Sequence, residues 1–119
     1  MSNLRLAAIV EALSLTPNAD YPHDVVVHGG YCSDLLSDVM GRATAGCVWV
    51  TNQVHVNVVA VASLVEAAAV IIAGGVCPES QTLEKAAATH VPLFTSDLSA
   101  FEVVGLLYEM GVKGAVRGG

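Results

Sequence analysis

The chain has 119 residues, of which 54% are hydrophobic and only 13% are charged, and its formal net charge is −6 at pH 7. This length suits one domain with a single core and is too short for a core plus a separate catalytic unit. The apolar composition excludes a disordered chain. Its five Lys and Arg residues are scattered, so no basic patch for nucleic acid is expected.

Cellular location is indicated by what the sequence lacks. No apolar run reaches the roughly 18 residues that a membrane-spanning helix needs, and the first residues contain no apolar core of a signal peptide. The three cysteines, Cys32, Cys47 and Cys77, form neither a CxxC pattern nor an even disulfide set. We therefore expect a cytoplasmic protein with reduced thiols and no membrane partner.

The first half of the chain contains a helix and then a strand–turn–helix unit. Residues 4–13 place apolar side chains at helical spacing, which predicts an amphipathic helix. Residues 25–28 are mostly β-branched and end at Gly29-Gly30, so a strand is expected there. A second helix should begin near Ser33-Asp34.

The same order of elements recurs three more times. Strands are predicted at 47–51, 69–73 and 92–95, with helices over 58–67, from residue 78, and from the capping box Ser99-x-x-Glu102 to Gly111. Continuously apolar strands that are joined by helical segments are typical of a parallel sheet covered on both faces. The expected fold is α/β, with three layers and a mainly parallel sheet of about four strands.

Domain organisation is simple. The sequence contains no internal linker, so residues 1–119 are expected to form one domain. Residues 113–119 are rich in glycine and lack apolar spacing, which predicts a flexible tail.

The loops that follow the strands are the candidate ligand site. In a parallel sheet these loops and the helix N-termini behind them meet at one edge, where they can hold an anion. The candidate ligand-binding residues are Gly29, Gly30, Asn52, Gln53, His55, Asn57, Gly74, Gly75 and Asp97. The glycines would let a ligand approach the backbone, and the polar side chains would hydrogen-bond to it. The alternative is that the glycine pairs only permit turns with positive φ.

His55 is the one histidine in a polar cluster. In an extended stretch it would share a face with Gln53 and Asn57. A catalytic base would also need an orienting carboxylate, for which Asp34 and Asp97 are the candidates. A non-catalytic histidine that makes hydrogen bonds is the favoured interpretation, so no catalytic residue is assigned.

Motifs for nucleotide hydrolysis and metal binding are incomplete. The segment 41–46 has the glycine spacing of a phosphate-binding loop, but Cys47-Val48 occupies the positions of Lys and Ser/Thr. The Gly-x-Gly-x-x-Gly pattern is also missing, and no cofactor is expected. The residues His28, Cys32, His55 and Cys77 fall near strand ends but lack the spacing of metal ligands, so no metal site is assigned.

Three segments carry a family resemblance: residues 29–40 (GGYCSDLLSDVM), 70–79 (VIIAGGVCPE) and 83–97, which includes VPLFTSD. Over about residues 25 to 110 the chain resembles DRTGG domains and the N-terminal domain of HPr kinase/phosphorylase. It departs from the DRTGG motif at residues 52–57, where Asp-Arg is expected, and at Ala73, which replaces the Thr of Thr-Gly-Gly.

The resemblance implies a regulatory and dimerising domain, because the kinase activity of such proteins belongs to a separate P-loop domain. Stand-alone members resemble components found near iron-hydrogenase genes, which implies a protein partner in a redox or hydrogenase-linked system. The favoured function is a non-catalytic sensory or dimerisation module that binds a small anionic ligand or nucleotide at the carboxyl edge. The alternatives are a ligand-binding protein proper and an enzyme that uses His55.

A homodimer or larger oligomer is also expected from the helix predicted at 58–67. Its residues Val58, Val59, Val61, Ala62, Leu64 and Val65 make it apolar on more than one face. A sheet covers only one face of a helix, which would leave the other for a second copy.

Overall fold

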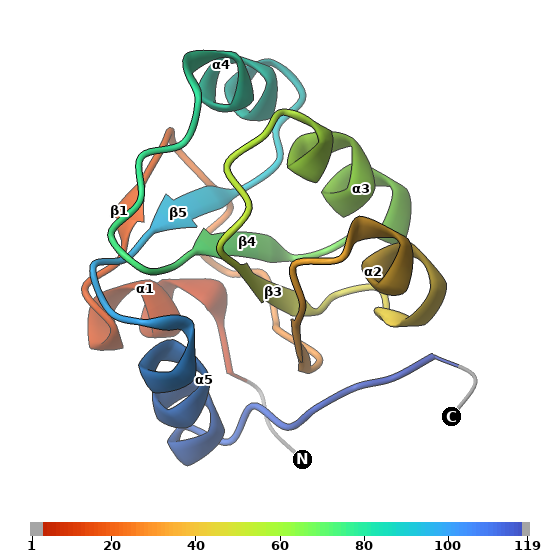
Figure 1. Cartoon of the computed structure of the whole chain (residues 1–119). Coiled ribbons are helices and arrows are strands. Elements are labelled where there is room, and N and C mark those ends of the chain that lie inside the picture. The colour runs from red at the N-terminus through yellow and green to blue at the C-terminus, as the bar shows by residue number, and fades with distance from the viewer. Residues whose placement is uncertain (1–3, 118–119) are drawn as a thin grey trace.

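The computed structural model describes residues 4–117, which form one five-stranded sheet with five helices around it (Figure 1). The strands are β1 (Thr16–Pro17), β2 (Gly30–Cys32), β3 (Val48–Thr51), β4 (Ala69–Ile72) and β5 (Leu93–Thr95). Their order across the sheet is β1-β5-β4-β3-β2. Strands β2 to β5 are parallel, and β1 pairs antiparallel with β5. The predicted α/β fold is confirmed, with one short strand more than expected.

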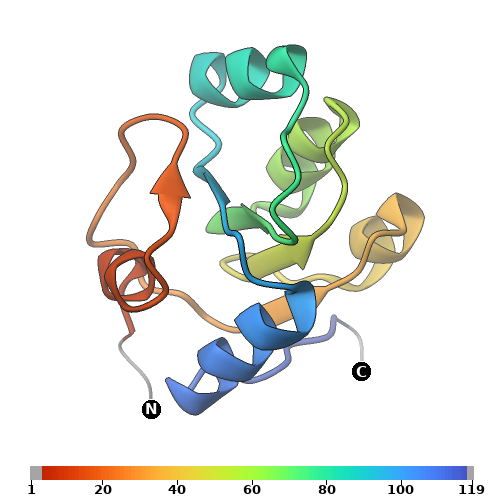
Figure 2. The same ribbon diagram turned by 60° about the vertical axis from the view of Figure 1, so that its left-hand side comes forward.

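The helices form the two outer layers, as the views in Figures 1 and 2 show. They are α1 (Leu6–Ala12), α2 (Leu36–Arg42), α3 (Asn57–Val65), α4 (Ser80–Ala88) and α5 (Ala100–Glu109). Buried side chains of α2, α3 and α4 pack with one face of the sheet, and those of α1 and α5 with the other. The three-layer arrangement with helices on both faces is therefore confirmed.

Topology explains this distribution of helices. Strands β2 to β5 are neighbours in the order in which they occur in the chain, and crossovers of one hand bring α2, α3 and α4 onto the same face. The chain then leaves β5 toward the opposite face, where α5 lies. In open α/β sheets, a crevice opens where neighbouring strands send their helices to opposite faces. Here that position is between the carboxyl ends of β4 and β5.

The central strands are buried on both faces, which accounts for their unbroken apolar sequences. In β3, Val48 and Val50 belong to the core beneath α1 and α5, whereas Trp49 belongs to the core beneath α2, α3 and α4. All four residues of β3 and all four of β4 are buried.

The predicted strand at 25–28 is wrong. This segment pairs with the start of α1 and the residues just before it instead, because Val27 N–H donates to Leu4 O (2.9 Å) and Leu6 N–H donates to Val25 O (2.8 Å). The strand that enters the sheet is β2, at Gly30–Cys32. Gly29 and Gly30 therefore lie at the amino end of a strand and do not follow its carboxyl end.

Helix ends follow the predicted signals in α5. The Ser99 hydroxyl accepts a hydrogen bond from Glu102 N–H (3.2 Å), as the capping box predicted. Gly111 follows the end of the helix with a φ of 104°. The helix α4 begins at Ser80, two residues later than expected.

The described part of the C-terminal segment runs beside β2. Gly30 N–H donates to Lys113 O (2.9 Å), Ala115 N–H donates to Gly30 O (3.1 Å), and Arg117 N–H donates to Arg42 O (2.7 Å). Gly118 and Gly119 lie outside the described residues. The flexibility expected of residues 113–119 stays a prediction.

The expected apolar outer face of α3 is nearly absent. Only Leu64 is well exposed, at 68%, whereas the other five residues named for this face are buried. The helices α2 and α4 flank α3 and cover what the sheet does not. The argument for a dimer through α3 was therefore wrong, although the dimer itself stays a prediction. Within residues 4–117, no helix has the length and apolar character needed to cross a membrane.

Candidate functional site

The carboxyl edge of the sheet brings together the loops after β2, β3, β4 and β5. Strands β3 and β4 are parallel neighbours, so the loops that follow them lie side by side, as predicted. A direct bond joins them, because Asn52 Nδ2 donates to Ala73 O (2.8 Å). Asn52 thus uses its amide group to hold the loop that contains Gly74.

Asp34 is the centre of the hydrogen bonds between the first two of these loops. Its Oδ1 accepts from Thr51 Oγ1 (2.8 Å) and from Asn52 N–H (2.7 Å), and its backbone oxygen accepts from Gln53 Nε2 (2.8 Å). Asp34 was considered as a catalytic partner of His55 but was not among the candidate ligand residues. Its position at the predicted helix start Ser33-Asp34 was the signal that could have placed it at this edge, because in a parallel sheet the helices that follow the strands begin there.

The amide groups of the glycine pair Gly74-Gly75 are also used within the protein. Gly74 N–H donates to Leu98 O (2.7 Å), and Gly75 N–H donates to Ser96 O (2.9 Å). These bonds close the position between β4 and β5 where a crevice would open. Both glycines have positive φ, 90° and 68°. The geometry therefore favours the interpretation of this pair as a structural turn.

His55 is exposed and acts on its own helix. Its Nδ1 accepts a hydrogen bond from Asn57 N–H (3.1 Å). This amide lies at the start of α3, where backbone N–H groups have no partner within the helix. Across residues 4–117, no hydrogen bond or ion pair joins His55 to a carboxylate. The expected extended stretch is wrong, because Val56 is helical (φ −58°, ψ −24°) and Asn57 already belongs to α3.

The pair Gly29-Gly30 lies away from this edge, at the amino end of β2. A Cβ atom at Gly29 would meet Ala115 Cβ at 2.5 Å, so this glycine allows the C-terminal segment to approach the backbone. The expectation that Gly29 and Gly30 share a site with Asn52 and Gly74 is therefore wrong. The error arose because the strand was predicted at 25–28, which put Gly29 and Gly30 after its carboxyl end.

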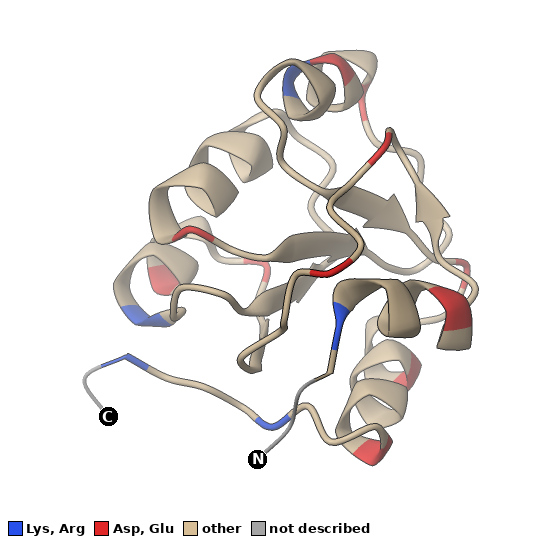
Figure 3. Cartoon of the chain, turned by 180° about the vertical axis from the view of Figure 1, so that it is seen from behind, with Lys and Arg blue, Asp and Glu red and all other residues tan. Residues whose placement is uncertain are grey.

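Charge at the carboxyl edge is negative. The loops over residues 33–35, 52–56, 73–79 and 96–99 contain Asp34, Glu79 and Asp97 but no Lys or Arg. Figure 3 shows the cations elsewhere, on α4, at the end of α2, before α1 and along the C-terminal segment. An anion at this edge would find no opposite charge, and the two amide groups of Gly74 and Gly75 are already bonded.

Several side chains in and near β2 have shifted pKa values, but none of the shifts makes a reactive nucleophile. The Tyr31 hydroxyl donates to Asp38 Oδ2 (2.7 Å), which raises the pKa of Tyr31 and lowers the pKa of Asp38. Partial desolvation of the Cys32 thiol and then the charge of Asp34 raise the pKa of Cys32, and burial raises the pKa of Cys47. Both thiols are therefore poor nucleophiles near neutral pH. In the described part of the chain, no three His, Cys, Asp or Glu side chains are grouped to hold a metal ion.

Comparisons with known proteins were made for sequence and structure. No family model and no curated protein matches the sequence. The structure is similar to the crystal structure of the CBS and DRTGG domains of the regulatory region of Clostridium perfringens pyrophosphatase, complexed with its activator diadenosine tetraphosphate. The TM-score is 0.64 at 17% identity, over 88% of this chain and 46% of that chain.

This similarity shows a shared fold. The fold is consistent with the DRTGG-like domain that the sequence resemblance predicted. The chain spans about half of the regulatory region to which it is similar, since the match covers 46% of that chain.

Proposed function

We propose that this chain is a non-catalytic regulatory module. One observation carries the proposal. At the carboxyl edge, where α/β domains usually place their active sites, Asp34, Asn52 and the Gly74-Gly75 amides hydrogen-bond to other loops of the same edge. A nucleophile, base and oxyanion site would need such groups to be free. The fold shared with a regulatory region supports the same conclusion.

A ligand site at the carboxyl edge remains part of this proposal, but for a ligand of a different chemical class from the anion expected from the sequence. Polar groups there that make no described hydrogen bond include His55 Nε2, the side-chain amide of Asn57 and the carboxylates of Glu79 and Asp97. Together with the absence of Lys and Arg, these groups suit a neutral or cationic ligand that donates hydrogen bonds better than the nucleotide or other anion first expected. The partner in a redox-linked system rests on the family resemblance alone.

Turnover and binding can be tested on the same sample. The protein is incubated with ATP and with a panel of phosphorylated metabolites, and the products are followed by phosphorus NMR. We expect no conversion. Formation of a product by the pure protein, and its loss in His55→Ala, would overturn the proposal in favour of the enzyme that uses His55.

Binding is measured by thermal shift, because a ligand that binds only the native state raises the melting temperature. The panel contains diadenosine tetraphosphate, other nucleotides, polyamines and neutral amides. We expect stabilisation by a neutral or cationic compound, and a smaller shift in Asp97→Asn. A larger shift with polyanions than with any other class would show that the ligand chemistry proposed for this edge is wrong.

A further inference from the structure

A cavity of about 370 Å³ lies between α5, the edge strand β2 and the C-terminal segment over residues 112–116. Core side chains reach it from below, because Val50, Leu107 and Val112 line it and are at most 7% exposed. Val104 and Tyr108 line it from the outer part of α5. We call this cavity the β2 groove. Its volume lies at the small end of the range of about 300–1,000 Å³ that is usual for small-molecule sites.

The groove exists because β2 has small side chains on this face of the sheet. Gly30 pairs with Val48 and Cys32 pairs with Val50, and paired residues of neighbouring strands point to the same face. Val48 and Val50 belong to the core on the α5 side. On that side β2 therefore contributes no side chain at Gly30 and only a thiol at Cys32. Larger side chains at these two positions would fill the space beside α5.

The C-terminal segment is fixed where it borders the groove. A Cβ at Gly30 would lie 3.1 Å from Val112 Cγ1, so the glycine pair at 29–30 allows this segment to lie against β2. Farther along, the Arg117 guanidinium donates to Met40 O (2.7 Å) at α2. Figure 1 shows the segment running from the end of α5 toward α2. The groove is therefore bounded by hydrogen-bonded backbone on the side of the C-terminal segment.

One charged group stands at the groove. Among the described residues that line it, only Lys113 is charged at neutral pH, and most of the others are apolar. Lys113 Nζ lies 3.6 Å from the centre of the Tyr108 ring. Across residues 4–117, no carboxylate forms an ion pair with this ammonium group. An ammonium group over an aromatic face still has N–H groups to donate.

We propose that the β2 groove binds a small apolar carboxylate, with its hydrocarbon chain along Val50 and Val112 and its carboxylate at Lys113 Nζ. The apolar lining suits a hydrocarbon chain, and the single ammonium group complements a single negative charge. A sugar, a base or a polyphosphate would need more polar partners than this lining offers. The site goes beyond the proposed function, because it lies along the outer edge of β2 and not at the loops after β3 and β4.

Isothermal titration calorimetry with octanoate tests the ligand class. We expect saturable binding with one site per chain. Octylamine has the same chain and the opposite charge, so it should bind more weakly by about fivefold or more, and acetate, which lacks the chain, should give no binding. Absence of octanoate binding, or equal affinities for octanoate and octylamine, would overturn the proposal.

The carboxylate contact is tested with Lys113→Met, which removes the charge and keeps an unbranched side chain. Its affinity for octanoate should fall about twofold to fivefold, as expected when one exposed ion pair is lost, while its affinity for 1-octanol should not change. Lys85→Met is the matched control, because Lys85 is also exposed but lies on α4, on the other face of the sheet. Equal octanoate affinities of Lys113→Met and the wild type would show that Lys113 does not hold the carboxylate.

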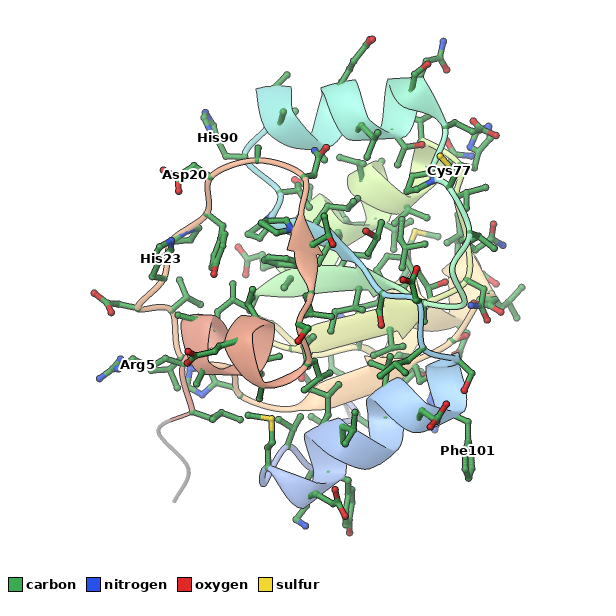
Figure 4. The ribbon with its side chains drawn as sticks, turned by 90° about the vertical axis from the view of Figure 1, so that its left-hand side faces the viewer. Arg5, Asp20, His23, Cys77, His90 and Phe101 are labelled. Atoms are coloured by element: carbon green, nitrogen blue, oxygen red, sulfur yellow. The ribbon has the colours of Figure 1, made fainter. Side chains whose placement is uncertain are left out.

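Thiol alkylation of the wild-type protein tests where the ligand binds. Cys32 and Cys77 are both exposed, and only Cys32 lines the groove. Figure 4 shows Cys77 close to α4, with α5 at the opposite side of the molecule. At alkaline pH, octanoate should slow the reaction of Cys32 with iodoacetamide in proportion to occupancy and leave the rate at Cys77 unchanged, as followed by peptide mass spectrometry. An unchanged rate at Cys32 with saturating octanoate, or equal slowing at both thiols, would overturn the placement in this groove.

Discussion

Single residues hold the loops of the carboxyl edge in place. Asp34 bonds to β3 and to the loop after it, and Asn52 bonds to the loop after β4. Sequence reasoning placed Asn52 at this edge but treated its amide as free for a ligand. The partner of an amide in a neighbouring loop depends on the path of both loops, which spacing along one chain does not specify.

Removal of Asp34 should destabilise the fold. In Asp34→Ala, the fully buried Thr51 hydroxyl loses its acceptor, so we expect a loss of about 1–3 kcal/mol in the free energy of unfolding. Urea unfolding followed by Trp49 fluorescence measures it. Asp20→Ala is the control, since Asp20 is exposed and should change stability by less than about 0.5 kcal/mol. Equal effects of the two variants would argue against the structural role of Asp34.

The Tyr31–Asp38 bond predicts a pH dependence. The hydrogen bond from Tyr31, and then one from Ser33, lower the pKa of Asp38 from its ordinary value of 3.8. A carboxyl group with a depressed pKa in the folded state stabilises the fold above its unfolded pKa and loses this effect as pH falls through the folded pKa. Carbon NMR titration should therefore place Asp38 below 3.8 and show its pKa rising in Tyr31→Phe. An unchanged pKa in that variant would contradict the assignment.

At the scale of elements, burial decided which strands could be predicted. Strands β3 and β4 are buried on both faces, and their unbroken apolar runs were identified within one residue at each end. Strand β1 has two residues and β2 has three, with exposed or partly exposed side chains, so neither has an apolar pattern. The run at 25–28 had the composition of a strand, but it hydrogen-bonds to Leu4 and to Leu6 at the start of α1.

The turn between β4 and α4 requires glycine. At Gly74 the φ is 90°, and a Cβ would come within 2.9 Å of Asn52 Nδ2, so Gly74→Ala should destabilise the protein by about 1–3 kcal/mol. Gly41→Ala is the matched change inside α2, where a Cβ meets nothing within 4 Å, and it should stabilise by about 0.5–1 kcal/mol. Thermal unfolding of both variants checks the opposite signs, and a tolerated Gly74→Ala would refute the account of this turn.

For the whole molecule, the order of the strands has two consequences. It places α4 and α5 on opposite faces, which locates a crevice position between β4 and β5, and it leaves the outer side of α5 without a covering layer. The parallel order and the adjacency of the loops after β3 and β4 followed from the sequence. The bonds that close the crevice position did not, because they depend on where residues 96–98 turn after leaving β5.

The central claim is that the backbone amides of the carboxyl edge are hydrogen-bonded within the protein, so that this edge is not a phosphate-binding site. Proton–nitrogen NMR of the Gly74 and Gly75 amides tests it most directly, through their exchange with solvent and their shifts during titration with adenosine monophosphate. Because these amides donate to Leu98 O and Ser96 O, we predict slow exchange and no shift. Fast exchange of both amides, with large saturable shifts on titration, would contradict the account.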